Sequence, residues 1–470
     1  MRCIVACLLL AAWSVAARAD EPADEPAGSP PPAAAAHDDT APKDDLGFAF
    51  GSYGRVGVGT DLRGSTPEAV NVVHKGTRVV ENDYTELDLY YRLRTASGVR
   101  VKTVTTIAAA GEPFHYTGKF DAQLALRNFY AEAATGALSL WVGSRLYRGD
   151  DIYLLDYWPL DDLNTIGGGV VYARDRLNAA FQVGANRLLD PFQYQTREVS
   201  DPVFGATTIV ELDRQRFVTS AKAEYRVWGE PAGPAVKVKG YLEAQGLPSG
   251  SRTRADESVE NLPGDFGYTA GAQLGAWGFA PGRSHANLFV RWSQGLTAFD
   301  ELQLPKGFDA SKKTFPKASE LMLATSINYE FPRGGVLFGG YARRFVNASP
   351  STADHDDGWE YIVDTRPHYA VIGDVEAAVD LSYQVRFPRG LDPTTLTAQD
   401  PAVMQVAPMV LYSPFGPGSY SRPQLRLIYR AAHLNAGARD LYPLDDPRRD
   451  RSWVHFLGVE AEWWFNSTYR

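Results

Sequence analysis

From residue 46 onward, apolar and polar side chains alternate in short segments of the chain. Residues 84–94 place Thr85, Leu87, Leu89, Tyr91 and Leu93 at one set of positions, and Tyr84, Glu86, Asp88, Tyr90, Arg92 and Arg94 at the other. A period of two is typical of a β-strand, because successive side chains point to opposite faces. Residues 235–245, 320–331 and 454–465 alternate in the same way. The pattern therefore predicts an all-β protein.

About eighteen such segments follow one another, and the connections between them alternate in length. Short turns are expected at 96–98, 135–137 and 332–334, and long polar connections at 61–83, 148–166, 188–215, 247–266, 297–317 and 435–451. This alternation is typical of a transmembrane antiparallel β-barrel with short periplasmic turns and long extracellular loops. The 420 residues from 46 to 465 give each of eighteen strands about ten residues and a connection.

A β-sandwich or a propeller with one face in water would also alternate. Two features of the apolar face favour the barrel. Gly and Ala are frequent on it, which suits a packed sandwich core poorly. Aromatic residues also gather at strand ends near short turns or the C-terminus, as in an interfacial girdle: Tyr225, Tyr329, Phe331, Trp463 and Phe465.

The N-terminus is expected to direct export and then to be removed. Arg2, the mostly apolar residues 3–17 and the small-x-small site at 17–19 predict a signal peptide over residues 1–19. In residues 20–45, thirteen of the 26 residues are Pro or Ala, with eight acids against one Lys, which predicts a disordered leader. Both cysteines fall within the signal peptide, so no disulfide framework is expected in the barrel, residues 46–470.

Composition excludes several functional classes. Acids outnumber Lys plus Arg by 56 to 47, which argues against nucleic acid as a partner. After the N-terminus, no apolar run approaches the length of a membrane-spanning helix. Nothing resembles a nucleophile elbow, a phosphate-binding glycine loop or a zinc helix, and none of the eight histidines stands in a recognisable serine–histidine hydrolase motif. We therefore expect no enzyme, no cofactor and no metal site.

Six stretches, in chain order, resemble the maltoporin family of carbohydrate-specific porins. They are FAFGSYGRVGVG (48–59), NDYTELDL (82–89), WVGSRLYRGDDIYLLDYW (141–158), RPHY (366–369), YSRPQLR (420–426) and GVEAEWWF (458–465). The resemblance is weak between residues 187 and 356. It implies an outer-membrane homotrimer, embedded in bacterial outer-membrane lipid, that passes oligosaccharides by facilitated diffusion.

The resemblance also assigns roles to residues. It implies a lane of aromatic rings that stack on sugars, formed by Tyr53, Tyr84, Tyr420 and Trp464. It implies a facing polar track of Arg55, Glu86, Arg127, Asp151 and Asp156. The connection after residue 148 should fold into the lumen, where Trp158 takes the place of a constricting tyrosine. Tyr157 is the alternative ring there, and Arg148 adjoins Gly149, which stands where the family has its constriction arginine.

Two other functions remain open from the sequence. A non-selective general porin would use the same barrel, with its lumenal aromatic residues merely filling space. A surface protein that presents its loops as an adhesin is the third possibility. Liposome swelling distinguishes the first two, because only a sugar channel passes saccharides faster than solute size predicts.

Overall fold

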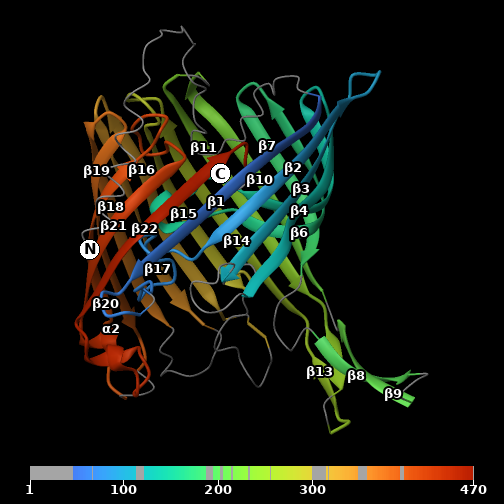
Figure 1. The fold of residues 1–470 in the computed structure, drawn as a ribbon. Helices are drawn as coiled ribbons and strands as arrows, with labels where there is room; N and C mark the ends of the chain where they lie inside the picture. The colour runs from blue at the N-terminus through green and yellow to red at the C-terminus, as the bar shows by residue number, and fades with distance from the viewer. Residues whose placement is uncertain are drawn as a thin grey trace. The chain divides into compact units, whose positions relative to one another are not determined.

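The computed structural model describes residues 46–468, apart from 66, 113–120, 187–193, 202–204, 213–214, 231–232, 254–255, 299–313, 316, 348–356 and 392–395. The expected signal peptide and leader lie outside the described residues. Eighteen antiparallel strands form one sheet, and β1 pairs with β22, so the sheet closes into a barrel (Figure 1). Closure leaves no unpaired edge, as a strand-built wall in a membrane requires. The predicted eighteen-stranded barrel is confirmed.

The barrel strands follow chain order around the wall, with each strand paired to its neighbours in sequence. They are β1 (Gly47–Thr60), β2 (Tyr84–Arg94), β3 (Arg100–Glu112), β4 (Asp121–Thr135), β5 (Leu138–Arg148), β6 (Asp162–Arg174), β7 (Leu177–Asn186), β10 (Arg216–Gly229), β11 (Ala235–Leu247), β14 (Asp265–Trp277), β15 (His285–Gly295), β16 (Ser319–Phe331), β17 (Gly334–Val346), β18 (Gly358–Ile372), β19 (Val375–Pro388), β20 (Ala402–Tyr412), β21 (Gln424–Leu434) and β22 (Trp453–Phe465).

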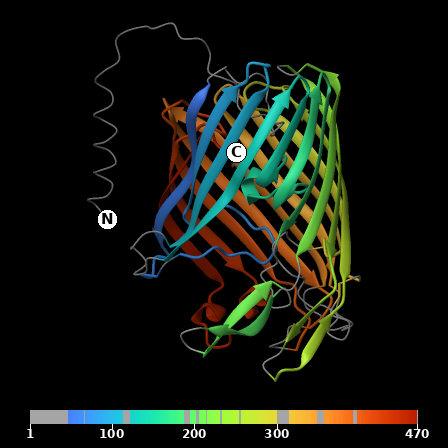
Figure 2. The ribbon, with the colours of Figure 1, turned by 90° about the vertical axis from the view of Figure 1, so that its right-hand side faces the viewer.

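Short turns lie at one end of the barrel and the long connections lie at the other (Figure 2). The long connections carry the hairpins β8 (Tyr194–Asp201) with β9 (Gly205–Leu212) and β12 (Gly250–Thr253) with β13 (Val259–Leu262). The connection after β21 holds α2 (Ala436–Asp440) and η4 (Pro447–Asp450). Among the described residues, no helix is long and apolar enough to cross a membrane.

Burial follows the predicted alternation, with the apolar positions on the outside. In β2, Leu87 and Tyr91 are 43% and 53% exposed, whereas Glu86 and Asp88 face the interior and have no exposed surface. A soluble sandwich would bury the leucines and expose the acids. The charged residues therefore line the lumen, and the outer wall is an apolar surface suited to lipid.

Aromatic side chains form belts at both ends of this outer wall. Four of the five aromatic residues predicted for the girdle near the short turns lie exposed there: Tyr225, Tyr329, Phe331 and Phe465. The fifth, Trp463, is half-buried. Trp359 and Tyr361 are exposed at the other end, where β18 begins. From Trp359 to Tyr369 is ten residues of one strand, or about 25 Å across the membrane at a tilt of about 40°. That is the height of the apolar band of an outer-membrane barrel.

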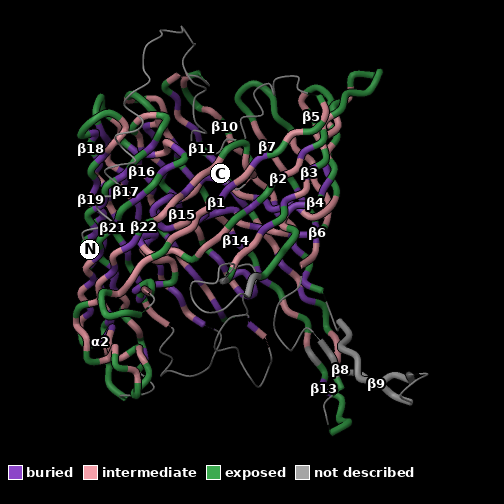
Figure 3. The backbone as a smooth tube through the Cα atoms, in the orientation of Figure 1, coloured by how far each residue is buried: buried purple, intermediate pink, exposed green. Residues whose placement is uncertain are grey.

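Two long connections turn back into the lumen rather than outward, and both contain buried residues. Figure 3 colours the chain by burial, with buried residues in purple. The inward loop, residues 149–161, was expected in the lumen, and its Ile152, Leu155 and Leu160 are buried. The first connection, residues 61–83, also folds inward. Its Val70, Val72 and Val73 join the inward loop in one apolar cluster against the wall.

Candidate functional site

Three predicted lane residues lie side by side on neighbouring strands. β1 lies between β2 and β22, and Tyr53 is the register partner of both Glu86 and Trp464. The Tyr53 and Tyr84 ring centroids are 6.0 Å apart, and Tyr53 stacks on Trp464 at 6.5 Å with an interplanar angle of 17°. The closing pair of strands therefore places three rings in one row on the lumenal wall.

Two rings from connections extend this row. Tyr153, in the inward loop, lies 6.4 Å from Trp464, and Tyr420, in the turn after β20, lies 5.3 Å from Tyr153. We call Tyr84, Tyr53, Trp464, Tyr153 and Tyr420 the aromatic row. All four predicted lane residues belong to it. Tyr153 was not predicted.

Four of the five predicted polar residues gather at the Tyr84 end of the aromatic row. Arg127 Nη1 donates to the Tyr84 hydroxyl at 2.6 Å and lies 3.4 Å from Glu86 Oε1, while the Tyr84 hydroxyl donates to Glu86. Arg55 Nη1 lies 3.1 Å from Asp156 Oδ2. Asp151 is the exception, because it lies half-buried in the inward loop near His285, which neighbours Tyr420. Charged donors and acceptors therefore flank the rings.

The two candidate constriction rings face different walls. Trp158 packs beside Tyr53, and the Arg148 guanidinium lies over its ring, 3.8 Å from the centroid. Tyr157 points to the other side, where its hydroxyl lies 3.0 Å from Met322 Sδ and its ring 6.0 Å from that of Tyr341. Of the two alternatives, Trp158 is the ring next to the aromatic row.

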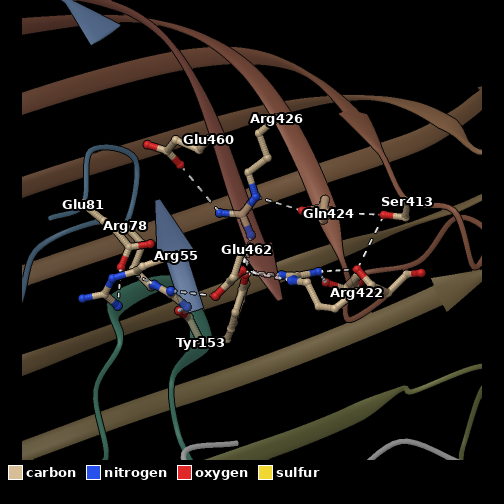
Figure 4. A network of polar contacts seen from close by, with 12 residues as sticks. Arg55, Arg78, Glu81, Tyr153, Ser413, Arg422, Gln424, Arg426, Glu460 and Glu462 are labelled. Atoms are coloured by element: carbon tan, nitrogen blue, oxygen red, sulfur yellow. Dashed lines mark hydrogen bonds and ion pairs between the residues drawn. The ribbon is translucent and has the colours of Figure 1, made fainter. Parts of the chain in front are cut away.

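One buried carboxylate, Glu462, ties this region together (Figure 4). Glu462 accepts from Arg78 at 2.9 Å, from Arg422 at 2.9 Å and also from Arg426. The hydroxyls of Tyr53 and Tyr153 donate to it at 3.1 and 2.7 Å. Its partners come from the first connection, the inward loop, the turn after β20 and two strands, so Glu462 fixes three connections against the wall.

Sequence reasoning missed Arg78 as a member of this site. Its signal was a run of valines in a segment expected to be polar: Val70, Val72, Val73, Val79 and Val80. Such a run has reason to be buried, and Arg78 lies within it.

Guanidinium groups cover one face of several rings. Arg422 lies 4.3 Å from the Trp464 centroid, and Arg78 lies 4.7 Å from that of Tyr153. Arg78 also donates to the Tyr53 hydroxyl at 3.1 Å, and Tyr53 has no exposed surface. In this conformation the first connection therefore closes the middle of the aromatic row.

The inward loop is anchored on the opposite wall by a buried acid. Asp150 Oδ2 lies 2.9 Å from Lys237 Nζ and 3.0 Å from Lys239 Nζ, and accepts from Gln273 at 2.7 Å. Burial alone would raise the pKa of Asp150, but the two ammonium groups outweigh burial and hold that pKa well below its usual range. The loop thus stays charged at its attachment point and spans the lumen between two walls.

Deleting residues 155–161 of the inward loop is expected to raise single-channel conductance, because this segment carries Trp158 and Tyr157 across the lumen. Single-channel recording in planar bilayers measures the change. Deleting residues 254–257, between β12 and β13, is the control and should leave conductance unchanged. Equal conductance of both deletions and wild type would place the constriction elsewhere.

A closed barrel with an apolar outer band, two aromatic belts and a charged lumen narrowed by inward connections is an outer-membrane channel of the porin class. The LamB porin family model matches residues 48–465, and the chain belongs to this family. The protein is therefore a porin, a channel of the bacterial outer membrane, as predicted.

Two solved structures are similar to this chain over most of its length, with TM-scores below 0.5. OccAB1 of Acinetobacter baumannii has a TM-score of 0.46 at 10% identity, covering 90% of this chain and 97% of that one. OpdK of Pseudomonas aeruginosa has a TM-score of 0.44 at 11% identity, covering 90% and 99%. No curated protein sequence is significantly similar to this chain.

Proposed function

We propose that this porin passes oligosaccharides, of the maltodextrin kind, by facilitated diffusion along the aromatic row. The observation that supports this most is the continuous row of five rings with charged side chains at its flank. A sugar ring presents apolar faces and a rim of hydroxyls, so it needs both kinds of surface. A non-selective pore has no use for a continuous row of aromatic rings in its lumen.

Binding along the row must be weak for the channel to conduct. Millimolar affinity corresponds to about −4 kcal/mol, which a few ring contacts and hydrogen bonds supply. Tyr84, Trp464 and Tyr420 are the half-buried rings on which sugars would stack. The pairs Arg55–Asp156 and Arg127–Glu86 would exchange hydrogen bonds with the hydroxyls.

We further propose that the protein functions as a homotrimer in outer-membrane lipid.

Two adjacent tryptophans test the proposal. Trp464 faces the lumen beside Tyr53, whereas the Trp463 indole lies on the outer side, where its Nε1 donates to Ser52 Oγ at 3.2 Å. Trp464→Ala should weaken sugar block of the current by about 0.5–1.5 kcal/mol, or roughly 2- to 13-fold. Trp463→Ala should leave sugar block unchanged and instead lower the heat resistance of the protein on gels. If Trp463→Ala weakens sugar block and Trp464→Ala does not, the aromatic row does not bind sugar.

A further inference from the structure

The first connection runs round the lumen in contact with five successive strands. Side chains of β21, β20, β19, β18 and β17 each bond one backbone group of residues 68–75, in chain order. The five bonds are Arg430 Nη1 to Glu68 O at 3.1 Å, Gln405 Nε2 to Val70 O at 3.2 Å, Val72 N to Gln384 Oε1 at 3.2 Å, His74 N to Glu360 Oε2 at 3.2 Å, and Lys75 N to Tyr341 Oη at 2.9 Å. We call Tyr341, Glu360, Gln384, Gln405 and Arg430 the polar ledge.

The spacing of these bonds follows from barrel geometry. Strands about 4.8 Å apart and tilted by about 40° are crossed every 6.3 Å or so by a path around the wall. Two residues of an extended chain cover about 6.6 Å. A chain lying on the polar ledge therefore meets one ledge side chain for about every two residues. Backbone groups make these five contacts, and Gln384 Nε2 also donates to the side-chain oxygen Asn71 Oδ1 at 2.8 Å. The ledge therefore recognises mainly the spacing of donors and acceptors.

The polar ledge keeps hydrogen-bonding capacity that residues 68–75 do not use. Gln405 Oε1 and the Nε and Nη2 atoms of Arg430 have no hydrogen-bond partner among the described residues, although both side chains are at most 1% exposed. Ser382 Oγ, on the strand beside Gln405, is likewise buried without a partner in that part of the chain. Acceptors and donors are thus mixed on one wall, and a hydroxyl group serves both because it donates and accepts.

We propose that the polar ledge is a second binding track for the hydroxyls of an oligosaccharide, and that residues 68–75 occupy it as an internal stand-in for the solute. The proposal rests on the proposed function of the aromatic row. The same connection carries Arg78, which covers Tyr53, so its departure exposes the ledge and the middle of the aromatic row together.

Occupation of the polar ledge by residues 68–75 lowers the apparent affinity for solute. Val70, Val72 and Val73 are buried among lumenal side chains, so residues 68–75 hold the ledge in most molecules. A solute that needs the ledge binds only the remaining fraction, and its apparent dissociation constant rises in proportion. Removing the stand-in should therefore tighten sugar binding, which a purely structural segment would not do.

The test compares the full-length channel with a variant lacking residues 67–76. In planar bilayers, the deletion should raise conductance and lower the maltohexaose concentration that half-blocks the current about tenfold or more. A synthetic peptide of residues 68–76, EAVNVVHKG, added from the loop side should block the deletion variant and compete with the sugar. Val72→Asp in the full-length chain, which puts a charge into the apolar cluster, should shift sugar block in the same direction and serves if the deletion variant does not insert.

Substitutions on the deletion background locate the binding track. Gln384→Ala and Gln405→Ala should each weaken sugar block about 3- to 10-fold. Gln182→Ala is the matched control, since Gln182 is a buried lumenal glutamine on β7 that donates to Ser220 away from the ledge, and it should change nothing.

Two outcomes overturn the inference and remain distinguishable from a failure of the proposed function. If the deletion and Val72→Asp leave sugar block unchanged while Trp464→Ala still weakens it, the aromatic row binds sugar and the polar ledge does not. If the peptide fails to compete and both ledge substitutions match the Gln182→Ala control, residues 68–75 are structural only. Absence of sugar block in the wild type, with no effect of Trp464→Ala, would instead reject the proposed function.

Discussion

Replacing Glu462 by alanine is expected to destabilise the packing of the first connection and the inward loop against the lumenal wall by about 3–5 kcal/mol. This is the usual loss when one partner of a buried ion pair is removed. The cost is high because Arg78, Arg422 and Arg426 all contact this carboxylate and all three side chains are at most 2% exposed. Their charges would repel one another once the carboxylate is gone. The substitution should therefore free the first connection and the inward loop while the hydrogen-bonded barrel wall stays closed.

The release of both connections is measurable as a larger single-channel conductance and as faster proteolysis within residues 61–83. Glu460→Ala is the matched control. Glu460 lies two residues away on the same lumenal face, but its carboxylate is 3.9 Å from Arg426 and bonds neither inward connection among the described residues. The control should behave like wild type. A Glu462→Ala channel of unchanged conductance would show that the carboxylate does not hold the connections in place.

Asp150→Ala is expected to give the second-largest effect, a loss of about 3 kcal/mol in the attachment of the inward loop. Lys237 and Lys239 are 2% and 4% exposed at the side chain, and the substitution leaves both ammonium groups with Glu224 as their shared partner. Conductance should rise, as in the loop deletion. Asp162→Ala is the control, because its ion pair with Arg148 is 39% exposed on the acid side and contributes little.

The pH dependence of this attachment has a definite sign. Because the folded pKa of Asp150 is depressed, its contribution is fully present above the unfolded value of about 3.9 and is lost only as pH falls through the folded pKa. The Asp150 anchor should therefore cause no change in wild-type conductance between pH 8 and about pH 4. A conductance step between pH 5 and pH 7 that disappears in Asp150→Ala would contradict this account of the anchor.

The wall of the channel was predictable because successive side chains of a strand point to opposite faces. The alternation in the sequence therefore shows which residues face the lipid and which face the lumen. Leu87 lies on the outer face and its neighbour Glu86 on the lumenal face. Trp463 and Trp464 are likewise adjacent in sequence and lie on opposite faces of the wall. Closure places β22 next to β1, which brings Trp464 to Tyr53 although 411 positions separate them. The resemblance to the maltoporin family had assigned both residues to one aromatic lane, but it had not given their pairing.

The lumenal connections were less predictable, because no fixed period describes their path. Tyr153 was part of a resembling segment, yet its place between Trp464 and Tyr420 depends on how the inward loop turns. Arg78 reaches Glu462 only because the first connection folds inward. The valines of the first connection indicate that it is buried, but they do not indicate which residues it packs against. The contacts of Tyr153 and Arg78 arise from tertiary packing, which the local sequence does not encode.

Current block by sugars in planar bilayers tests the central claim most directly. Maltodextrins of increasing length, added to the wild-type channel, should block the current at about millimolar concentrations, with affinity rising as more rings of the aromatic row are engaged. A polyether of matched size should not block. If sugars and polyethers of equal size reduce the current equally, the aromatic row binds no sugar, and the protein is a general diffusion porin.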